Sequence, residues 1–453
     1  MPCIVLRQAK RQVDREEYGH IRLRRNKDEA TLARYRICSG ECQPGVERLS
    51  ILAGNCHAIS HSRANGYPNE VTAIPSTTPA PTDTSQPTPA PGAKAMWSFQ
   101  SEGPIWGTPA ISEGTVYFGS DDHNLYAVEA QSGLLKWKFT TQGIVRSRPA
   151  IADGKVYLAS DDGYLYAIDT QDGKQIWRTD IGNAMPRDQR EHLGTSRPTD
   201  YDYLQSSPAV AYGQVYVGSL DGNVYALAAD TGKINWTYKT GLKVRATPTI
   251  DDGTLYVGSW DKFVYALDAL TGQERWKTPI GGEVQTTALV AGGMVYCASR
   301  KASVVALDAQ TGAPKWEFGY GSNMWVESSP RLKDGIIYIG SSGNRNVMGV
   351  DSQTGEAITG FSLSAFYWST PALVGDMLYI GGTSYRHSEK SGLLAMKLVN
   401  GKFTSTDQAQ WYFPGEETLE ASGDWSGVAS SPVVVDGVIY FGGLDGKLYA
   451  VRD

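Results

Sequence analysis

A motif of about 40 residues recurs eight times along the chain and limits the fold more than any other feature of the sequence. Each copy contains a tyrosine that follows Val, Leu or Ile, and eight residues before it stands a proline, replaced once by Ala288. The tyrosines are Tyr117, Tyr157, Tyr216, Tyr256, Tyr296, Tyr338, Tyr379 and Tyr440. They are 40 to 42 residues apart, except for two intervals of 59 and 61 residues. This period is the one expected of propeller blades.

Within each copy, four short apolar or β-branched segments are separated by Asp-Gly, Gly-Gly or Thr-Gly pairs. Such pairs supply the positive φ angles of tight turns between antiparallel strands. Helical periodicity is absent after residue 96. Four strands cannot bury both faces of their own sheet, so neighbouring sheets must stack. The sequence therefore predicts an all-β, eight-bladed propeller of four-stranded antiparallel blades.

The two ends of the repeat region predict how the ring closes. Residues 96–99 (MWSF) match the last strand of a copy, as in residues 135–139 (LKWKF), whereas the chain stops after residues 448–451 (LYAV), which match a third strand. We therefore expect the first strand to complete the last blade, which would hide open sheet edges and bring the ends of the propeller together.

Composition divides the chain into three parts. Residues 1–70 carry 12 Lys+Arg and 8 Asp+Glu, and we expect a poorly structured basic segment, with a short helix around residues 28–37. Residues 71–95 form a Pro/Thr-rich linker of extended character. From residue 97 the balance is 29 basic to 39 acidic residues, which argues against nucleic acid as the partner of the propeller at 96–453.

Features relevant to localisation point in different directions. No apolar run of about 18 to 20 residues could span a bilayer, and the first residues lack the apolar core of an export signal. A Pro/Thr stalk before a repeat domain is nevertheless typical of exported proteins. We expect a periplasmic, extracellular or cell-envelope protein, and a misassigned start site would explain the missing signal. Membrane association would then need an anchor that this sequence does not show.

Residues 127–137, 167–177, 266–276 and 306–316 share an Ala-x-(Asp/Glu) element, a (Thr/Ser/Asp)-Gly pair and a final tryptophan. They resemble the tryptophan-docking repeat of quinoprotein (PQQ-like) β-propellers, and the resemblance covers residues 97–453. That family contains quinone-dependent dehydrogenases and a non-enzymatic BamB-like branch, to which this chain is closer in character. Fold alone does not choose between the two branches.

Several repeated residues have a structural interpretation. We expect a tryptophan on the last strand to lie flat on the next blade, except in the sixth copy, where residues 357–361 (AITGF) make a weaker junction. These tryptophans are Trp97, Trp137, Trp177, Trp236, Trp276, Trp316 and Trp411. The aspartates Asp169, Asp268, Asp308 and Asp351 should cap the following turn, and Cys297 should be a small core residue.

The position three residues before the proline varies from copy to copy, whereas structural positions repeat. It holds Trp106, Arg146, Gln205, Arg245, Gln285, Glu327, Trp368 and Ala429. In the resembled family this position faces the mouth of the central channel, which implies a site for a planar or anionic ligand. The alternative is that Arg146 and Arg245 simply pair with Glu327 or nearby acids.

Insertions into the repeat at residues 183–204 and 383–428 are candidate partner-binding loops. On or near them we single out Arg187, Arg190, Trp325, Tyr385 and Trp425, and we expect Trp325, Trp368 and Trp425 to be exposed. The alternative is that both insertions are neutral surface loops.

Motifs of catalysis are missing from the sequence: HExxH, GxSxG, a phosphate loop and adjacent cysteines do not occur. Glu327 alone could imitate the calcium-binding glutamate of the resembled dehydrogenases. We therefore expect no catalytic residues, metal or cofactor, and a monomeric envelope scaffold that binds other proteins. The alternative is a dehydrogenase that uses PQQ and calcium to oxidise an alcohol or sugar.

Overall fold

The computed structural model describes residues 18–22, 32–36, 93–182, 205–301, 303–320, 326–362, 365–385, 391–403, 411–413 and 425–452. The chain divides into two compact units, residues 1–81 and 82–453. In the first, β1 (Tyr18–Arg22) pairs antiparallel with β2 (Leu32–Arg36). The expected helix around residues 28–37 is therefore wrong for 32–36, where alternating apolar and polar residues suit a strand. Most of the linker lies outside the described residues.

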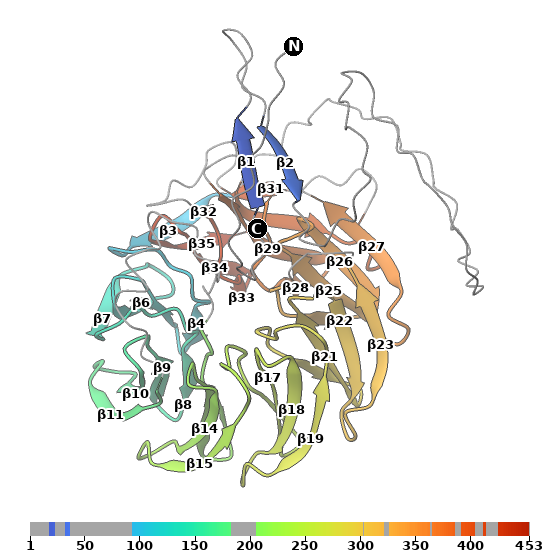
Figure 1. Cartoon of the computed structure of the whole chain (residues 1–453). Coiled ribbons are helices and arrows are strands. Elements are labelled where there is room, and N and C mark those ends of the chain that lie inside the picture. The colour runs from blue at the N-terminus through green and yellow to red at the C-terminus, as the bar shows by residue number, and fades with distance from the viewer. Residues whose placement is uncertain are drawn as a thin grey trace, which may run out of the picture. The chain divides into compact units, whose positions relative to one another are not determined.

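The second unit contains eight antiparallel blades arranged as a ring (Figure 1), which confirms the predicted fold class. Blade 1 comprises β4 (Ala110–Ser112), β5 (Thr115–Gly119), β6 (Asn124–Glu129) and β7 (Leu135–Thr140). Blade 2 comprises β8 (Ala150–Ala152), β9 (Lys155–Ala159), β10 (Tyr164–Asp169) and β11 (Gln175–Asp180). Blade 3 comprises β12 (Ala209–Ala211), β13 (Gln214–Gly218), β14 (Asn223–Ala228) and β15 (Ile234–Lys239). Blade 4 comprises β16 (Thr249–Asp251), β17 (Thr254–Gly258), β18 (Phe263–Asp268) and β19 (Glu274–Pro279).

The remaining blades follow the same pattern. Blade 5 comprises β20 (Leu289–Ala291), β21 (Met294–Ser299), β22 (Ser303–Asp308) and β23 (Pro314–Gly319). Blade 6 comprises β24 (Arg331–Lys333), β25 (Ile336–Ser341), β26 (Asn346–Asp351) and β27 (Ala357–Ser362). Blade 7 comprises β28 (Ala372–Val374), β29 (Met377–Tyr385), β30 (Gly392–Lys397) and β31 (Trp411–Phe413), and β32 (Trp425–Gly427) adds to the end of β29. Blade 8 comprises β33 (Val433–Val435), β34 (Val438–Gly442), β35 (Lys447–Arg452) and β3 (Ala95–Gln100).

Blade 8 closes the ring as predicted, because its outer strand comes from the start of the propeller and the other three from its end. Ala95 lies opposite Val451, and Trp97 lies opposite Ala450. The first strands of successive blades contact one another around the ring. Figure 1 shows the fourth strands, such as β11, β15 and β19, at the periphery. The loops that precede the first strands therefore reach the central channel.

The hydrophobic core is divided into layers between neighbouring blades. One layer joins Tyr157 and Leu165 of blade 2 to Val215 and Leu227 of blade 3, all of them buried. The next junctions repeat this arrangement with equivalent residues. Cys297 lies fully buried in the layer between blades 4 and 5, as predicted for a small core residue. Each blade is thus stabilised by its neighbours and not by a core of its own.

Tryptophan docking joins six outer strands to the next blade. The indole of Trp276 donates a 3.0 Å hydrogen bond to the carbonyl of Ala309, and its ring covers Gly312. This glycine has a φ of 71°, and a Cβ added to it would lie 2.6 Å from the indole, so only glycine allows the close approach. The same bond confirms the prediction for Trp97, Trp137, Trp177, Trp236, Trp276 and Trp316. The Trp411 side chain lies outside the described part.

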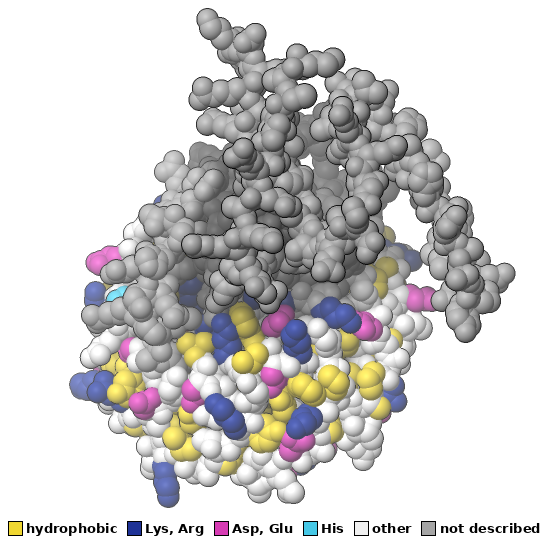
Figure 2. All heavy atoms as spheres, viewed as in Figure 1, with side chains coloured by type: hydrophobic (Ala, Val, Ile, Leu, Met, Phe, Trp, Pro, Cys, Tyr) yellow, Lys and Arg dark blue, Asp and Glu magenta, His cyan; other side chains and the backbone are white. Residues whose placement is uncertain are grey.

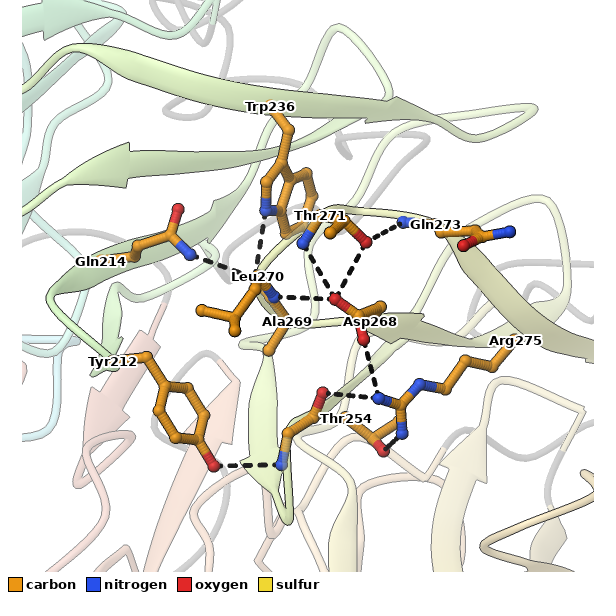
Figure 3. Close-up of polar contacts among 11 residues, drawn as sticks. Tyr212, Gln214, Trp236, Thr254, Asp268, Ala269, Leu270, Thr271, Gln273 and Arg275 are labelled. Carbon is orange, nitrogen blue, oxygen red and sulfur yellow. Dashed lines mark hydrogen bonds and ion pairs between the residues drawn. The ribbon is translucent and has the colours of Figure 1, made fainter.

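The turn that receives each indole is held by an aspartate. In Figure 3, Asp268 accepts hydrogen bonds from the amides of Leu270 and Thr271 at 3.1 and 2.9 Å, while Trp236 of the preceding blade donates to Ala269. The guanidinium of Arg275 lies 2.8 Å from the other carboxylate oxygen. Equivalent amide contacts occur at Asp169, Asp308 and Asp351, so the predicted turn capping is confirmed.

The junction between blades 6 and 7 differs. Thr359 occupies the place of the docking tryptophan, opposite Gly349, and its hydroxyl accepts a 3.0 Å hydrogen bond from the amide of Phe403. The rings of Phe361 and Phe403 lie 5.8 Å apart and fill part of the space. That this junction is the weakest one stays a prediction.

Candidate functional site

The segment leading into each first strand is extended, so alternate residues face the channel. We call the first set of channel-facing residues the mouth ring: Trp106, Arg146, Gln205, Arg245, Gln285, Glu327, Trp368 and Ala429. The second set, two residues further along each segment, is the hydroxyl ring: Thr108, Arg148, Ser207, Thr247, Thr287, Ser329, Thr370 and Ser431. Arg331 and three alanines line the next level. Together these residues surround a cavity of about 510 Å³.

All eight mouth-ring residues therefore border a single cavity, as expected from their position in the repeat. Whether they bind a ligand stays a prediction. Most of them are less than a tenth exposed.

Two polar members of the mouth ring, Arg146 and Gln205, pair with acids of the preceding blade. Arg146 makes a two-pronged contact with Asp121, with its Nε and Nη2 at 2.8 and 2.6 Å from the carboxylate oxygens. The amide of Gln205 donates to Asp161 at 3.0 Å. Asp121 and Asp161 both follow the serine that comes directly after the second strand of their blade. For Arg146 the structure supports the alternative interpretation of the sequence, pairing with a nearby acid.

Glu327 is enclosed by donors of hydrogen bonds. Its Oε1 lies 3.1 Å from Arg300, which occupies the position equivalent to Asp121, and accepts a 2.8 Å hydrogen bond from the amide of Gln285. Burial raises the pKa of Glu327, and the charge of Arg300 offsets part of this effect.

The surroundings of Glu327 do not fit a calcium ion. The guanidinium of Arg300 already neutralises the Glu327 carboxylate and would repel a second cation. Among the described residues, no three His, Cys, Asp or Glu side chains are placed to hold a metal together.

Aromatic residues form the opposite side of the mouth. Trp106 of blade 1 stacks on Trp368 of blade 7 with ring centroids 5.7 Å apart, and Trp368 contacts Trp425 on β32 at 4.5 Å. Arg146 lies 4.7 Å over the Trp106 ring. The expectation that Trp368 is exposed is wrong, since it is 8% exposed between the other two indoles. Trp425 is half-buried. We call these three residues the indole cluster.

The other partner-binding candidates are only partly defined. Tyr385 pairs through its backbone with Trp425, which brings the end of β29 next to the indole cluster. Arg187, Arg190 and Trp325 lie outside the described residues. Their proposed role stays a prediction.

Sequence reasoning missed two arginines that line the cavity. Arg148 stands where seven blades have serine or threonine, and Arg331 stands where the other blades have alanine, threonine, leucine or valine. Their departure from the repeat is the signal that could have revealed them. The pairing partners Asp121, Asp161 and Arg300 were also missed, although they share one position in the repeat.

The surface visible in Figure 2 carries Lys, Arg, Asp and Glu side chains interspersed with hydrophobic ones, without a broad patch of one sign. In the part of the chain that the structure describes, no helix has the length and apolar character needed to cross a membrane.

Comparisons with known proteins identify the repeat. A family model described as outer membrane protein assembly factor BamB matches residues 89–196, 184–273 and 243–402, which together span more than half of the chain. No curated protein matches the sequence significantly.

Solved structures share the fold at low identity. BamB from Moraxella catarrhalis is 21% identical with a TM-score of 0.54, covering 63% of this chain and 85% of its own. The computationally designed Ika8 protein is 16% identical with a TM-score of 0.55, covering 78% of this chain and 98% of its own. Quinohemoprotein alcohol dehydrogenase from Comamonas testosteroni is 15% identical with a TM-score of 0.59, covering 80% and 76%. A natural assembly factor, a designed protein and an enzyme thus share this architecture, so function must be argued from the site.

Proposed function

The chain belongs to the family of the outer membrane protein assembly factor BamB, and from this premise we propose that it is a non-catalytic scaffold of the cell envelope that binds other proteins. The name of the family supports a periplasmic or outer-membrane-associated location and partners among envelope components. The scaffold acts as a monomer, and recognition proceeds without chemistry.

The indole cluster is the observation that carries this proposal. Tryptophan supplies large contact areas at protein interfaces, and interface residues of this type commonly account for much of the binding energy. Trp368 packs against Trp425, and β32 places Trp425 next to the end of β29. The ion pairs Arg146–Asp121 and Arg300–Glu327 lie around the same channel mouth as this apolar cluster. A partner with an exposed apolar side chain would complete the burial of Trp425.

Photo-crosslinking in envelope extracts tests the proposal. A photoreactive phenylalanine analogue replaces Trp425 in the full chain, and a matched protein carries it at Tyr212, an exposed aromatic residue of blade 3. We expect a discrete protein adduct from position 425 that is absent from position 212. Trp368→Ala should weaken that adduct at least about fivefold, because the indole that packs against Trp425 is removed. Identical adduct patterns from both positions would contradict a binding role of the indole cluster.

The enzymatic alternative is tested separately. The full chain is titrated with PQQ and calcium while tryptophan fluorescence and dye-linked alcohol oxidation are followed. The pairing of Glu327 with Arg300 does not favour calcium binding, and we expect no turnover. Saturable turnover that Arg146→Ala/Arg245→Ala abolishes would replace the scaffold proposal with a quinoprotein dehydrogenase.

A further inference from the structure

The hydrogen bonds that join members of the hydroxyl ring all run in the same direction around the channel. The backbone amide of one ring residue donates to the side-chain hydroxyl of the ring residue in the next blade, as from Ser207 to Thr247 at 3.1 Å and from Thr370 to Ser431 at 2.9 Å. Six hydroxyls accept in this way: Thr108, Ser207, Thr247, Ser329, Thr370 and Ser431. Each oxygen is thereby committed as an acceptor, which leaves its O–H to donate. Among the described residues, none of the six donates to a protein acceptor.

Arg148 interrupts this ring. Its own amide donates to Ser207 at 2.8 Å, but it has no hydroxyl to accept the corresponding bond from blade 1. In place of a hydroxyl it brings five N–H donors. Its side chain borders the cavity and is accessible to water there. No described carboxylate forms an ion pair with it.

Arg331 faces Arg148 from the other side. It belongs to blade 6, four blades away from blade 2 in a ring of eight, and it begins β24 one level further along the channel. Its only hydrogen bond to a described residue is a 3.4 Å contact from Nη1 to the carbonyl of Pro330, and no described acid pairs with it. Burial lowers the pKa of Arg331, and the charge of Arg148 lowers it further. The two guanidiniums therefore repel one another across the channel.

The remaining charges around the cavity do not relieve this repulsion. Arg146 is paired with Asp121, and Glu327, the one carboxylate in the described lining, is paired with Arg300. The cavity thus has surplus positive charge inside a domain that carries 29 basic and 39 acidic residues. Like charges held in a partly enclosed space favour the binding of an anion.

We propose that the channel binds a dianionic tetrahedral oxyanion, the class that includes inorganic phosphate, sulfate and phosphate monoesters, between Arg148 and Arg331. Two guanidinium forks donate to it from opposite walls, and hydroxyls of the other hydroxyl-ring residues add further donors. The cavity of about 510 Å³ leaves room for an organic group on one ester oxygen. The site is independent of the proposed scaffold role, since the indole cluster lies at the mouth and forms none of these contacts.

Isothermal titration of the full chain with phosphate, and separately with sulfate, tests the site in chloride buffer of constant ionic strength. Two variants restore the residue type of the other blades, Arg148→Ser and Arg331→Ala, so the fold is expected to persist. We expect one bound anion per chain and at least about a tenfold loss of affinity in each variant. Arg178→Thr, which removes an exposed arginine from the outer strand of blade 2, should leave the affinity unchanged.

Thermal unfolding of the same proteins separates binding from folding. Without added anion, Arg148→Ser should be at least as stable as the parent, because the repulsion is removed and a hydroxyl stands at this place as in the other blades. Added phosphate should raise the Tm of the parent and not that of the variant. Absence of saturable binding, or equal affinity in parent and variants, would overturn the proposal. Binding of malonate without phosphate or sulfate would overturn the assignment to a tetrahedral anion.

Discussion

At the scale of single residues, positions that recur from blade to blade are accounted for by contacts within the protein. Asp268 caps a turn, and Trp276 docks on the next blade. Positions that vary between blades gather around the channel, where Arg146 and Glu327 each have a charged partner. Repetition therefore marks folding roles, and variation marks the places at which the blades acquire individual chemistry.

Cys297 should be unreactive in the folded protein. It is fully buried, and burial raises the pKa of its thiol to about 12, so almost no thiolate is present at neutral pH. We expect a maleimide reagent to leave Cys297 unmodified at pH 7.5 and to modify it in 6 M guanidinium chloride, as quantified on the peptide by mass spectrometry. Rapid native labelling would show that the core layer between blades 4 and 5 opens.

Asp268 should contribute to stability in a pH-dependent way. Hydrogen bonds from Arg275 and Thr271 lower its pKa to about 2, below the value of about 3.9 in an unfolded chain. The stabilisation is therefore complete above about pH 4 and is lost as the pH falls towards 2. Asp268→Asn should cost about 0.5–1 kcal/mol at pH 7, since the ion pair with Arg275 is partly exposed.

Thermal unfolding at pH 7, 4 and 2.5 measures this effect. The difference in Tm between Asp268→Asn and the parent should shrink at the lowest pH, whereas Asp252→Asn, an exposed aspartate of the same blade, serves as the control. A difference that stays constant with pH would show that the charge of Asp268 does not stabilise the fold.

At the scale of strands and blades, the junction is the unit of stability. Six outer strands each offer an indole, and the next blade offers a turn whose glycine leaves space for it. Between blades 6 and 7 the indole is absent, and Thr359 and Phe403 make the contact in its place. The strength of each junction then depends on one residue from each side.

Gly312→Ala should be clearly more damaging than Gly293→Ala in the same blade. Both glycines have positive φ, 71° and 76°, so alanine at either site costs about 1–2 kcal/mol in backbone strain. Only at Gly312 would the new Cβ meet the ring of Trp276, adding about 1–3 kcal/mol of overpacking. Chemical denaturation of both variants measures the difference, and equal losses would contradict the docking role of the glycine.

The junction between blades 6 and 7 should open more readily than the others. A docking tryptophan buries about 150–250 Å², and this contact is absent at Thr359. We expect amides of β27 to exchange with deuterium about tenfold faster than those of the equivalent β23. Equal protection of the two strands would show that the packing of Phe361 and Phe403 fully compensates for the indole.

At the scale of the whole molecule, the ring is held closed by β3, which pairs with β35 at the other end of the propeller sequence. This arrangement couples the first described strand of the propeller to the last. Without β3, blade 8 would expose the unpaired edge of β35, which promotes strand pairing with other chains.

Removal of residues 1–101 should therefore be far more harmful than removal of residues 1–92. The longer deletion takes away β3 and the docking of Trp97 on the carbonyl of Ala130, and it should lower the unfolding free energy by at least about 3 kcal/mol. Size-exclusion chromatography should show oligomers of the shorter protein only. Two deletion proteins of equal stability and size would contradict closure by β3.

The sequence by itself determined the number of blades, the four strands in each, six docking tryptophans, the turn-capping aspartates and the closure by residues 96–99. Each is a local pattern repeated at a fixed interval, so eight copies of the same physical constraint support one interpretation. The eight residues of the mouth ring were also predictable as a set, because the resembled family places this position of the repeat at the channel mouth.

Only the tertiary structure decided which residues of different blades meet. Arg146 finds Asp121, Glu327 finds Arg300, and the indole of Trp106 stacks on Trp368 from the other end of the propeller sequence. No local spacing encodes these contacts, because they depend on how the blades are turned about the ring axis when it closes. The same closure places Arg148 and Arg331 on opposite walls of one channel. In the sequence each is only a single position that differs from the repeat, and the fold brings the two positive charges together.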